Sequence, residues 1–165
     1  MGKEMRAVRS AAVTFAGVCI FGVTVCGIAP SAASPEDDAL ASQQQAVVSA
    51  FATAVVRDDH AGIAENAAPD IVWTIPGASA ISGQAKGIDA VIRLADTLSQ
   101  YELHIVPQGY LYGLNTVAVK LHDTGDRNGI RLDQDVVNVL TIRDGKIASV
   151  TATLTDVSAF DAYFS

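Results

Sequence analysis

The segment 102–154 consists of short runs rich in apolar and β-branched residues, separated by turn-forming residues. This pattern is typical of successive β-strands and limits the possible folds more than any other feature of the chain. In the segment 116–122 (TVAVKLH) large apolar residues alternate with smaller or polar ones, which predicts a strand with one buried face. The segment 136–142 is apolar on both faces, as expected for a strand at the centre of a sheet.

The connections between these strands are short. A first strand over 102–114 contains Pro107-Gln108-Gly109, which predicts a bulge or a bend in it. The segment 123–129 (DTGDRNG) is interpreted as a hairpin loop, and Asp144-Gly145 is typical of a tight turn before a last strand over 147–154. Strands that follow one another in this way predict an antiparallel meander.

The part of the chain before this sheet is mainly helical. Apolar residues recur every three or four positions in the segments 43–56 and 88–100, which predicts two amphipathic helices. Between them the sequence predicts a short helix over 60–67, a strand over 71–75 and a polar loop over 83–87.

A closing helical turn over 157–164, capped by Asp156, completes the chain. The predicted order is α-α-β-α-β-β-β-β, with three main helices segregated from an antiparallel sheet. This pattern is typical of an α+β domain.

The first 33 residues have the features of a secretion signal. Three basic residues and one acidic residue precede an uncharged run over 11–28, and small residues follow at Ser31 and Ala33. We expect cleavage after Ala33, a linker over 34–42, one domain over 43–165, and therefore a secreted protein. The alternative is an uncut segment 11–28 that anchors the domain in a membrane, because eighteen apolar residues lie near the lower limit for a membrane span.

Removal of residues 1–33 changes the composition in two ways. Both cysteines leave, so the mature chain has no disulfide and no thiol nucleophile. The first 33 residues hold three of the 11 basic and one of the 18 acidic residues, so the net charge falls from −7 to −9. A surface this acidic repels phosphates and excludes nucleic-acid binding.

Four segments, taken in order, resemble the nuclear transport factor 2-like superfamily, in particular its SnoaL-like and ketosteroid-isomerase-like branch. They are residues 57–77 (RDDHAGIAENAAPDIVWTIPG), 82–92 (SGQAKGIDAVI), 143–147 (RDGKI) and 155–164 (TDVSAFDAYF). The resemblance implies a strongly curved sheet that forms, with three helices, a cone around an apolar pocket. It also implies a homodimer that pairs through the open face of the sheet. Members include isomerases, polyketide cyclases, epoxide hydrolases, dehydratases and proteins that only bind a ligand, so the fold implies a pocket more than a reaction.

Two of the family's reactions do not match the residues present. The position of the ketosteroid isomerase base is occupied by Ile75, and the position of its phenol donor by Phe51. The limonene-type epoxide hydrolases have an aspartate on the last strand, but residues 149–154 contain no acid.

For the cyclase reaction the resemblance implies an aspartate base and an assisting histidine. The candidates are Asp135 and His122, on strands that we expect to pair across the loop 123–129. An apolar cone would raise the pKa of Asp135 into the range of a general base. The family's histidine lies further into the loop, near Asp126 and Arg127, and both candidates can equally lie on a solvated rim.

Other candidates concern ligand binding. Six residues on or next to the predicted strands are hypothesised to contact a ligand: Trp73, His104, Tyr110, Tyr112, Gln134 and Asn138. The three histidines lack metal-ligand spacing, and no phosphate-binding loop or nucleophile elbow occurs, so we predict no metal and no cofactor.

The sequence therefore predicts an exported, SnoaL-like pocket protein whose partner is a small apolar or polyketide-like molecule. One hypothesis is acid–base catalysis of cyclisation, isomerisation or dehydration. The alternatives are a module that binds a small ligand without converting it, and a dimerisation module.

Overall fold

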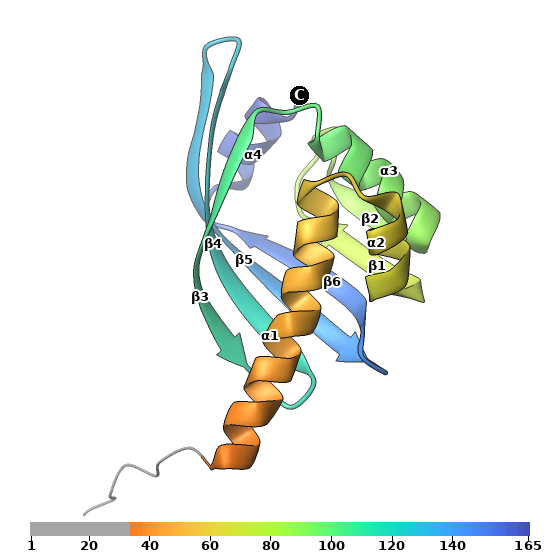
Figure 1. Cartoon of the computed structure of the whole chain (residues 1–165). Coiled ribbons are helices and arrows are strands. Elements are labelled where there is room, and N and C mark those ends of the chain that lie inside the picture. Colours follow the sequence, from red (N-terminus) through yellow and green to blue (C-terminus); the bar gives the residue numbers. More distant parts are fainter. Residues whose placement is uncertain (1–33) are drawn as a thin grey trace, which may run out of the picture. The chain divides into compact units, whose positions relative to one another are not determined.

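The computed structural model describes residues 34–165, which form a curved mixed sheet with helices on its concave side (Figure 1). The four helices are α1 (Pro35–Val56), α2 (His60–Asn66), α3 (Ile88–Leu98) and α4 (Val157–Tyr163). The predicted signal segment 1–33 lies outside the described residues. Within residues 34–165 no helix is long and apolar enough to cross a membrane.

Six strands form a single open sheet in the order β2-β1-β6-β5-β4-β3. They are β1 (Ala67–Ile75), β2 (Gly83–Lys86), β3 (Leu103–Tyr112), β4 (Thr116–Arg127), β5 (Ile130–Arg143) and β6 (Lys146–Leu154). The meander β3 to β6 is antiparallel, as predicted, and the register of β3 against β4 shifts between Pro107 and Gly109. The α+β fold class is confirmed.

The loop predicted over 123–129 is wrong, because β4 and β5 continue almost to the end of the hairpin. Arg127 pairs with Ile130, and only Asn128 and Gly129 form the turn, with φ angles of 53° and 80°. Positive φ at both central residues is characteristic of the type I′ turn, whose twist matches that of the paired strands. The polar residues 123–127 are therefore strand residues.

The loop predicted over 83–87 is also wrong in part. Residues Gly83–Lys86 form the edge strand β2, which pairs antiparallel with β1. Its polar side chains are mostly exposed, as an edge position permits. Because β1 pairs with β6 in parallel, the sheet is mixed rather than wholly antiparallel.

The linker predicted over 34–42 is wrong, because α1 already begins at Pro35. Ser34 and Asp37 form a capping box, with the Ser34 side chain accepting a hydrogen bond from the backbone N–H of Asp37. Proline at the first helical position and three acidic residues in the first turn also favour a helix start here. The closing turn predicted over 157–164 is the fourth helix, α4.

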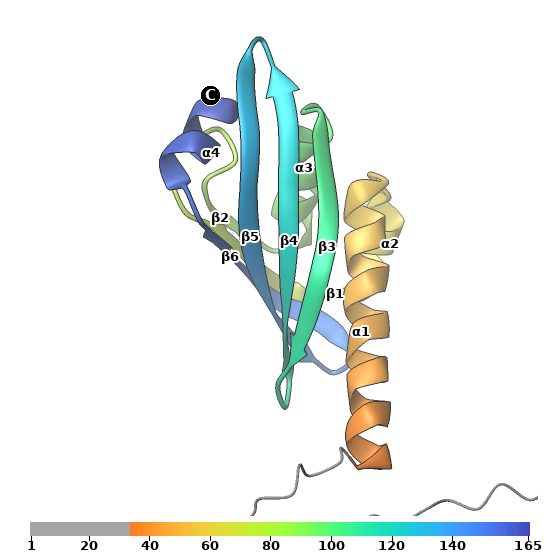
Figure 2. The same cartoon turned by 90° about the vertical axis from the view of Figure 1, so that its left-hand side faces the viewer.

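The core lies between the concave face of the sheet and the helices. The ring centroids of Phe51 on α1 and Trp73 on β1 are 6.0 Å apart, and Val91 on α3 is fully buried. The opposite, outer face of β3, β4 and β5 is covered by no described helix, as Figure 2 shows.

Candidate functional site

A pocket opens into the interior between the concave face of the sheet, α3 and α4. The cavity is small, with a volume of about 90 Å³. Most of its lining is apolar and includes Ile75, Ile81, Leu98, Leu103, Val136, Leu154, Phe160 and Phe164. Such a lining suits an apolar ligand whose orientation is fixed by a few polar groups.

Asp123 is the acidic residue in this lining. Its residue is only 7% exposed, and its Oδ1 has no hydrogen-bond partner among the described residues. Burial raises the pKa of the Asp123 carboxyl to about 6, although the neighbouring His122 opposes the rise. A carboxyl that titrates close to neutrality can both accept and donate a proton under physiological conditions.

The alternation of β4 explains why Asp123 points inward. The buried Val117 and Val119 and the half-buried Leu121 point to the inner face at every second position, and Asp123 is the next residue in this series. Its Cα partner on β5 is the buried Gln134. Asp123 is not among the residues predicted from the sequence, because it lies in the segment 123–129 that was expected to be a loop. The two-residue period of β4, continued from Leu121 to Asp123, would have indicated that the Asp123 side chain points inward.

Two further polar groups of residues in the pocket lining have no hydrogen-bond partner among residues 34–165. They are the Oδ1 of Asn138 and the indole Nε1 of Trp73. Asn138 lies four residues beyond Gln134 on β5, so its backbone is about 13 Å along the sheet from that of Asp123. The pocket therefore has polar groups at separate places and apolar surface between them.

Comparison with known proteins identifies the family. A model of the SnoaL-like domain matches residues 48–150. The chain belongs to the SnoaL-like family. The predicted relationship to the nuclear transport factor 2-like superfamily is thereby confirmed. No curated protein sequence matches this chain.

Solved structures agree with this assignment. A protein of unknown function with a cystatin-like fold from Xanthomonas campestris is 28% identical, with a TM-score of 0.66, and the match covers 73% of this chain and 97% of that one. A nuclear transport factor 2-like protein from Burkholderia xenovorans LB400 is 25% identical, with a TM-score of 0.67 and coverage of 75% and 97%. A protein from Jannaschia sp. CCS1, named as a proposed SnoaL-like polyketide cyclase, shares the fold at 17% identity, with a TM-score of 0.62 and coverage of 74% and 92%.

In this SnoaL-like domain the predicted pair His122 and Asp135 does form. The two residues are Cα partners, and His122 Nδ1 lies 2.9 Å from Asp135 Oδ1. The pair lies on the outer face of the sheet, however, where Lys120 Nζ is 2.7 Å from Asp135 Oδ2. Hydrogen bonds from Lys120 and His122 hold the pKa of Asp135 below its ordinary value, so the predicted rise in this pKa is wrong. Neither residue lines the pocket.

The six predicted ligand-binding residues divide into two groups. Trp73 and Asn138 line the pocket, and Gln134 is buried on the same face but outside the lining, its Oε1 accepting a hydrogen bond from the backbone N–H of Asp156. The other three do not reach the pocket. His104 is exposed on the outer face, Tyr110 packs against the edge of the core, and the Tyr112 hydroxyl donates to Gln45 on α1.

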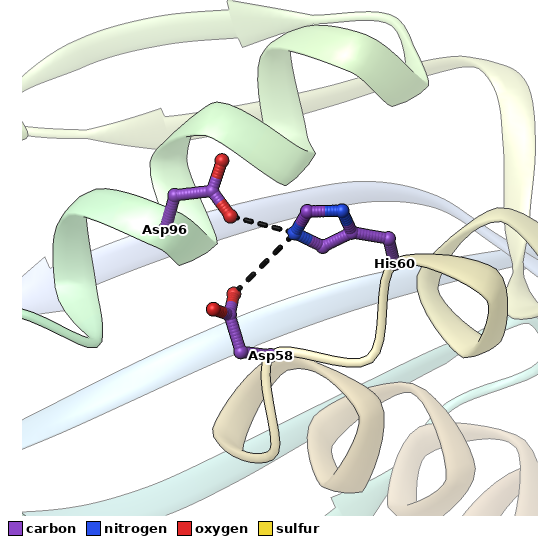
Figure 3. A group of neighbouring side chains, drawn as sticks. All are labelled: Asp58, His60 and Asp96. Carbon is purple, nitrogen blue, oxygen red and sulfur yellow. Dashed lines mark hydrogen bonds and ion pairs between the residues drawn. The ribbon is translucent and has the colours of Figure 1, made fainter.

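The fold also assembles one group of potential metal ligands that the spacing of histidines and acids along the sequence does not indicate. Asp58, His60 and Asp96 converge at the surface between the α1–α2 connection and α3 (Figure 3). Asp96 lies too far along the sequence for a local motif to reveal this group.

Proposed function

We propose that the domain binds a small, mostly apolar molecule in the interior pocket and that Asp123 converts it by acid–base catalysis. Membership in the SnoaL-like family supports a small-molecule-binding or cyclase-type role. The observation that carries the catalytic part is a carboxyl group with an unpartnered oxygen, buried in an apolar pocket and titrating near neutrality.

In the proposed reaction the Asp123 carboxylate removes a proton from a carbon next to a carbonyl group of the ligand. The apolar walls exclude water, which strengthens every electrostatic interaction in the pocket. The Trp73 N–H is a free donor that can stabilise negative charge on the ligand's oxygen. The proton then returns from the Asp123 carboxyl to another position, which permits isomerisation, ring closure by aldol addition, or loss of a hydroxyl group.

A second function, binding without conversion, is favoured by a different observation. Asp123 is the one ionisable side chain in the pocket lining, so the described residues supply no separate general acid. A ligand that only binds would use Trp73 and Asn138 as its polar contacts.

The variant Asp123→Asn separates these two functions. Thermal-shift screening of aromatic and polyketide-like ketones would identify ligands of the wild type, and proton exchange beside the carbonyl group would be followed in D2O by mass spectrometry. If Asp123 is the base, Asp123→Asn binds the same ligands but loses at least about a hundredfold of the exchange rate. Asp133→Asn, on the outer face, serves as the control. Equal exchange rates in wild type and Asp123→Asn would refute the assignment.

We also propose that the domain acts outside the cytoplasm after cleavage behind Ala33. The basic start, the apolar run and the small residues of segment 1–33 support this location. N-terminal sequencing of the protein recovered from a secreting host should begin at Ser34. Recovery of the intact chain in the membrane fraction would instead support the anchored alternative.

Finally, we propose that two copies of the chain pair through the outer face of the sheet. The support is an apolar row on the outer face of β3, β4 and β5, which consists of the exposed Leu111 and Val139 and the half-buried Ala118 between them.

A further inference from the structure

A second group of chemically active side chains lies away from the pocket, on the helical side of the domain. The Nε2 atom of His60, the first residue of α2, is 2.6 Å from Asp96 Oδ1 and 3.7 Å from Asp58 Oδ1. Figure 3 shows both carboxylates directed at this one imidazole nitrogen. Potential ligand atoms of the three residues all lie within 4.8 Å of one another.

Two parts of the fold position these residues: the α1–α2 connection with the start of α2, and α3. Asp58 lies in the short α1–α2 connection, where its N–H donates to Val55 O and its φ angle is 55°. The next residue, Asp59, caps α2 by accepting a hydrogen bond from the Gly62 N–H. The start of α2 is therefore fixed next to α3, which supplies Asp96.

The two carboxylates of this group have no lysine or arginine partner among residues 34–165, so negative charge is in excess there. His60 is the shared partner of Asp58 and Asp96. With the imidazole neutral, as a metal ligand requires, the group carries a charge of −2, which a divalent cation would neutralise. The hydrogen bond with Asp96 raises the pKa of His60, so a proton competes with the cation for the imidazole nitrogen. The mixed nitrogen and oxygen donors match the preferences of Zn²⁺ and related transition metals more closely than those of Mg²⁺ or Ca²⁺, which favour oxygen alone.

The spacing of the donors is also compatible with an ion. Ligands of a tetrahedral Zn²⁺ bond at about 2.0–2.2 Å, which places them roughly 3.3–3.5 Å apart. The observed 2.6 and 3.7 Å bracket this separation. The side chains are 40–53% exposed, so small rotations are free to bring all three donors onto one ion.

We propose that Asp58, His60 and Asp96 form a binding site for a divalent transition metal of the Zn²⁺ type. The ion would replace the direct contact between His60 and Asp96, and its fourth position would be open to water. Because Leu98, two residues beyond Asp96, lines the pocket, the ion would fix the helix that forms one pocket wall. The role is structural and does not depend on the reaction proposed for Asp123.

The test uses the purified protein, stripped of metals with EDTA and dialysed, at neutral pH. ZnCl₂ is titrated in by calorimetry, with MgCl₂ as a comparison, and thermal unfolding is followed in parallel. We expect one Zn²⁺ per chain, no comparable binding of Mg²⁺, and a rise in the melting temperature, because a ligand that binds only the folded state stabilises it. His60→Gln and Asp96→Asn should each weaken Zn²⁺ binding at least about tenfold.

His122→Gln is the matched control, because His122 also faces two carboxylates, Asp133 and Asp135, on the outer face. This variant should bind Zn²⁺ as the wild type does. The proposal is overturned if Zn²⁺ does not bind, if His60→Gln binds it unchanged, or if His122→Gln loses binding to the same extent. Reduced stability of His60→Gln in EDTA, without any effect of Zn²⁺ on the wild type, would identify the group as an ion pair alone and would also overturn it.

Discussion

At the scale of single residues, Asp123 should make the stability of the fold depend on pH. Its carboxyl has a pKa of about 6 in the folded protein and 3.8 as an isolated group, because burial opposes ionisation. Between these values the Asp123 carboxyl binds more protons in the native state than in the unfolded chain. The contribution of Asp123 to stability is therefore greatest below pH 3.8 and falls as the pH rises toward 6. The shift corresponds to a loss of at most about 3 kcal/mol.

Urea unfolding of wild type and Asp123→Asn on either side of this interval measures the effect. The free energy of unfolding of the variant, relative to the wild type, should increase as the pH is raised through the interval. The control Asp133→Asn, an exposed residue, should follow the wild type. A constant difference between wild type and Asp123→Asn at all pH values would contradict the buried, ionisable state of Asp123.

Asp123 also shows what the sequence could and could not predict at this scale. The alternation that directs Val117, Val119 and Leu121 toward the core places His122 on the opposite face, so the outward position of the predicted pair follows from the pattern itself. The pairing of His122 with Asp135 was predictable from the hairpin and is confirmed. The sequence did not indicate that the alternation of β4 continues beyond His122, because glycine and aspartate in 123–129 are typical of loops as well as of strand ends.

Gly125 on β4 is a second position where a single substitution should change the free energy of unfolding, because the structure leaves no room for a side chain there. A Cβ added there would meet the hydroxyl of Tyr163 and would lie 2.9 Å from the carbonyl oxygen of Glu102. That hydroxyl donates a hydrogen bond of 3.0 Å to the same carbonyl oxygen, so both partners would have to shift. Gly125→Ala should therefore lower the free energy of unfolding by about 1–3 kcal/mol.

The matched control is Gly109→Ala, because a Cβ at Gly109 would meet no atom within 4 Å. Its effect in the same urea titration should stay within about 0.5 kcal/mol. Equal losses in the two variants would mean that backbone freedom, rather than the contact with Tyr163, determines the effect.

At the scale of elements, Asp161 on α4 connects two parts of the pocket wall. Its carboxylate accepts hydrogen bonds from the backbone N–H groups of Ala78 and Ser79, at 2.9 and 3.0 Å. These groups belong to the β1–β2 connection, which carries Ile81 into the pocket lining, while α4 supplies Phe160. Asp161 therefore holds the two segments together.

Asp161→Asn should lower the free energy of unfolding by about 1–3 kcal/mol, because an amide accepts fewer and weaker hydrogen bonds from these N–H groups. Hydrogen exchange at Ala78 and Ser79 should accelerate. Asp156→Asn is the control, since asparagine and aspartate cap a helix equally well and Asp156 caps α4. Unchanged exchange at Ala78 in Asp161→Asn would show that the connection is held by other contacts.

The elements themselves were largely predictable, whereas their ends were not. Repeated apolar positions identified α1 and α3 and the four strands of the meander, because burial imposes a period on many residues at once. The start of α1 depends on the capping box of Ser34 and Asp37, and β2 depends on pairing with β1. Such ends are determined by a few local or tertiary contacts, which leave little periodic signal.

At the scale of the whole molecule, the parallel pairing of β1 with β6 completes the sheet. It joins a strand near the start of the domain to the last strand of the meander, with Trp73 opposite Val150. No local pattern indicates this pairing, and only the resemblance to a known fold implied the cone. The pocket depends on this pairing, because β1 supplies Trp73 and Ile75 to the sheet wall that the meander otherwise forms.

The outer face of the sheet provides the surface for the proposed dimer. Leu111, Ala118 and Val139 are successive Cα partners across β3, β4 and β5 and form an apolar row. Leu111 is 66% exposed and Val139 is 37% exposed, and no described helix covers them (Figure 2). A second copy related by a two-fold axis would bury this row against its own equivalent and so remove apolar surface from water.

Sedimentation equilibrium of the purified protein should therefore show a dimer, and the double variant Leu111→Lys, Val139→Lys should be monomeric. Lysines on both strands would place four positive charges in a two-fold interface, which opposes association far more strongly than it affects the fold of exposed positions. Leu114→Lys is the control, because Leu114 is 87% exposed in the β3–β4 connection, beyond the end of the row, and should leave the dimer intact. A monomeric wild type at high concentration, or a double variant that remains dimeric, would exclude this face as the interface.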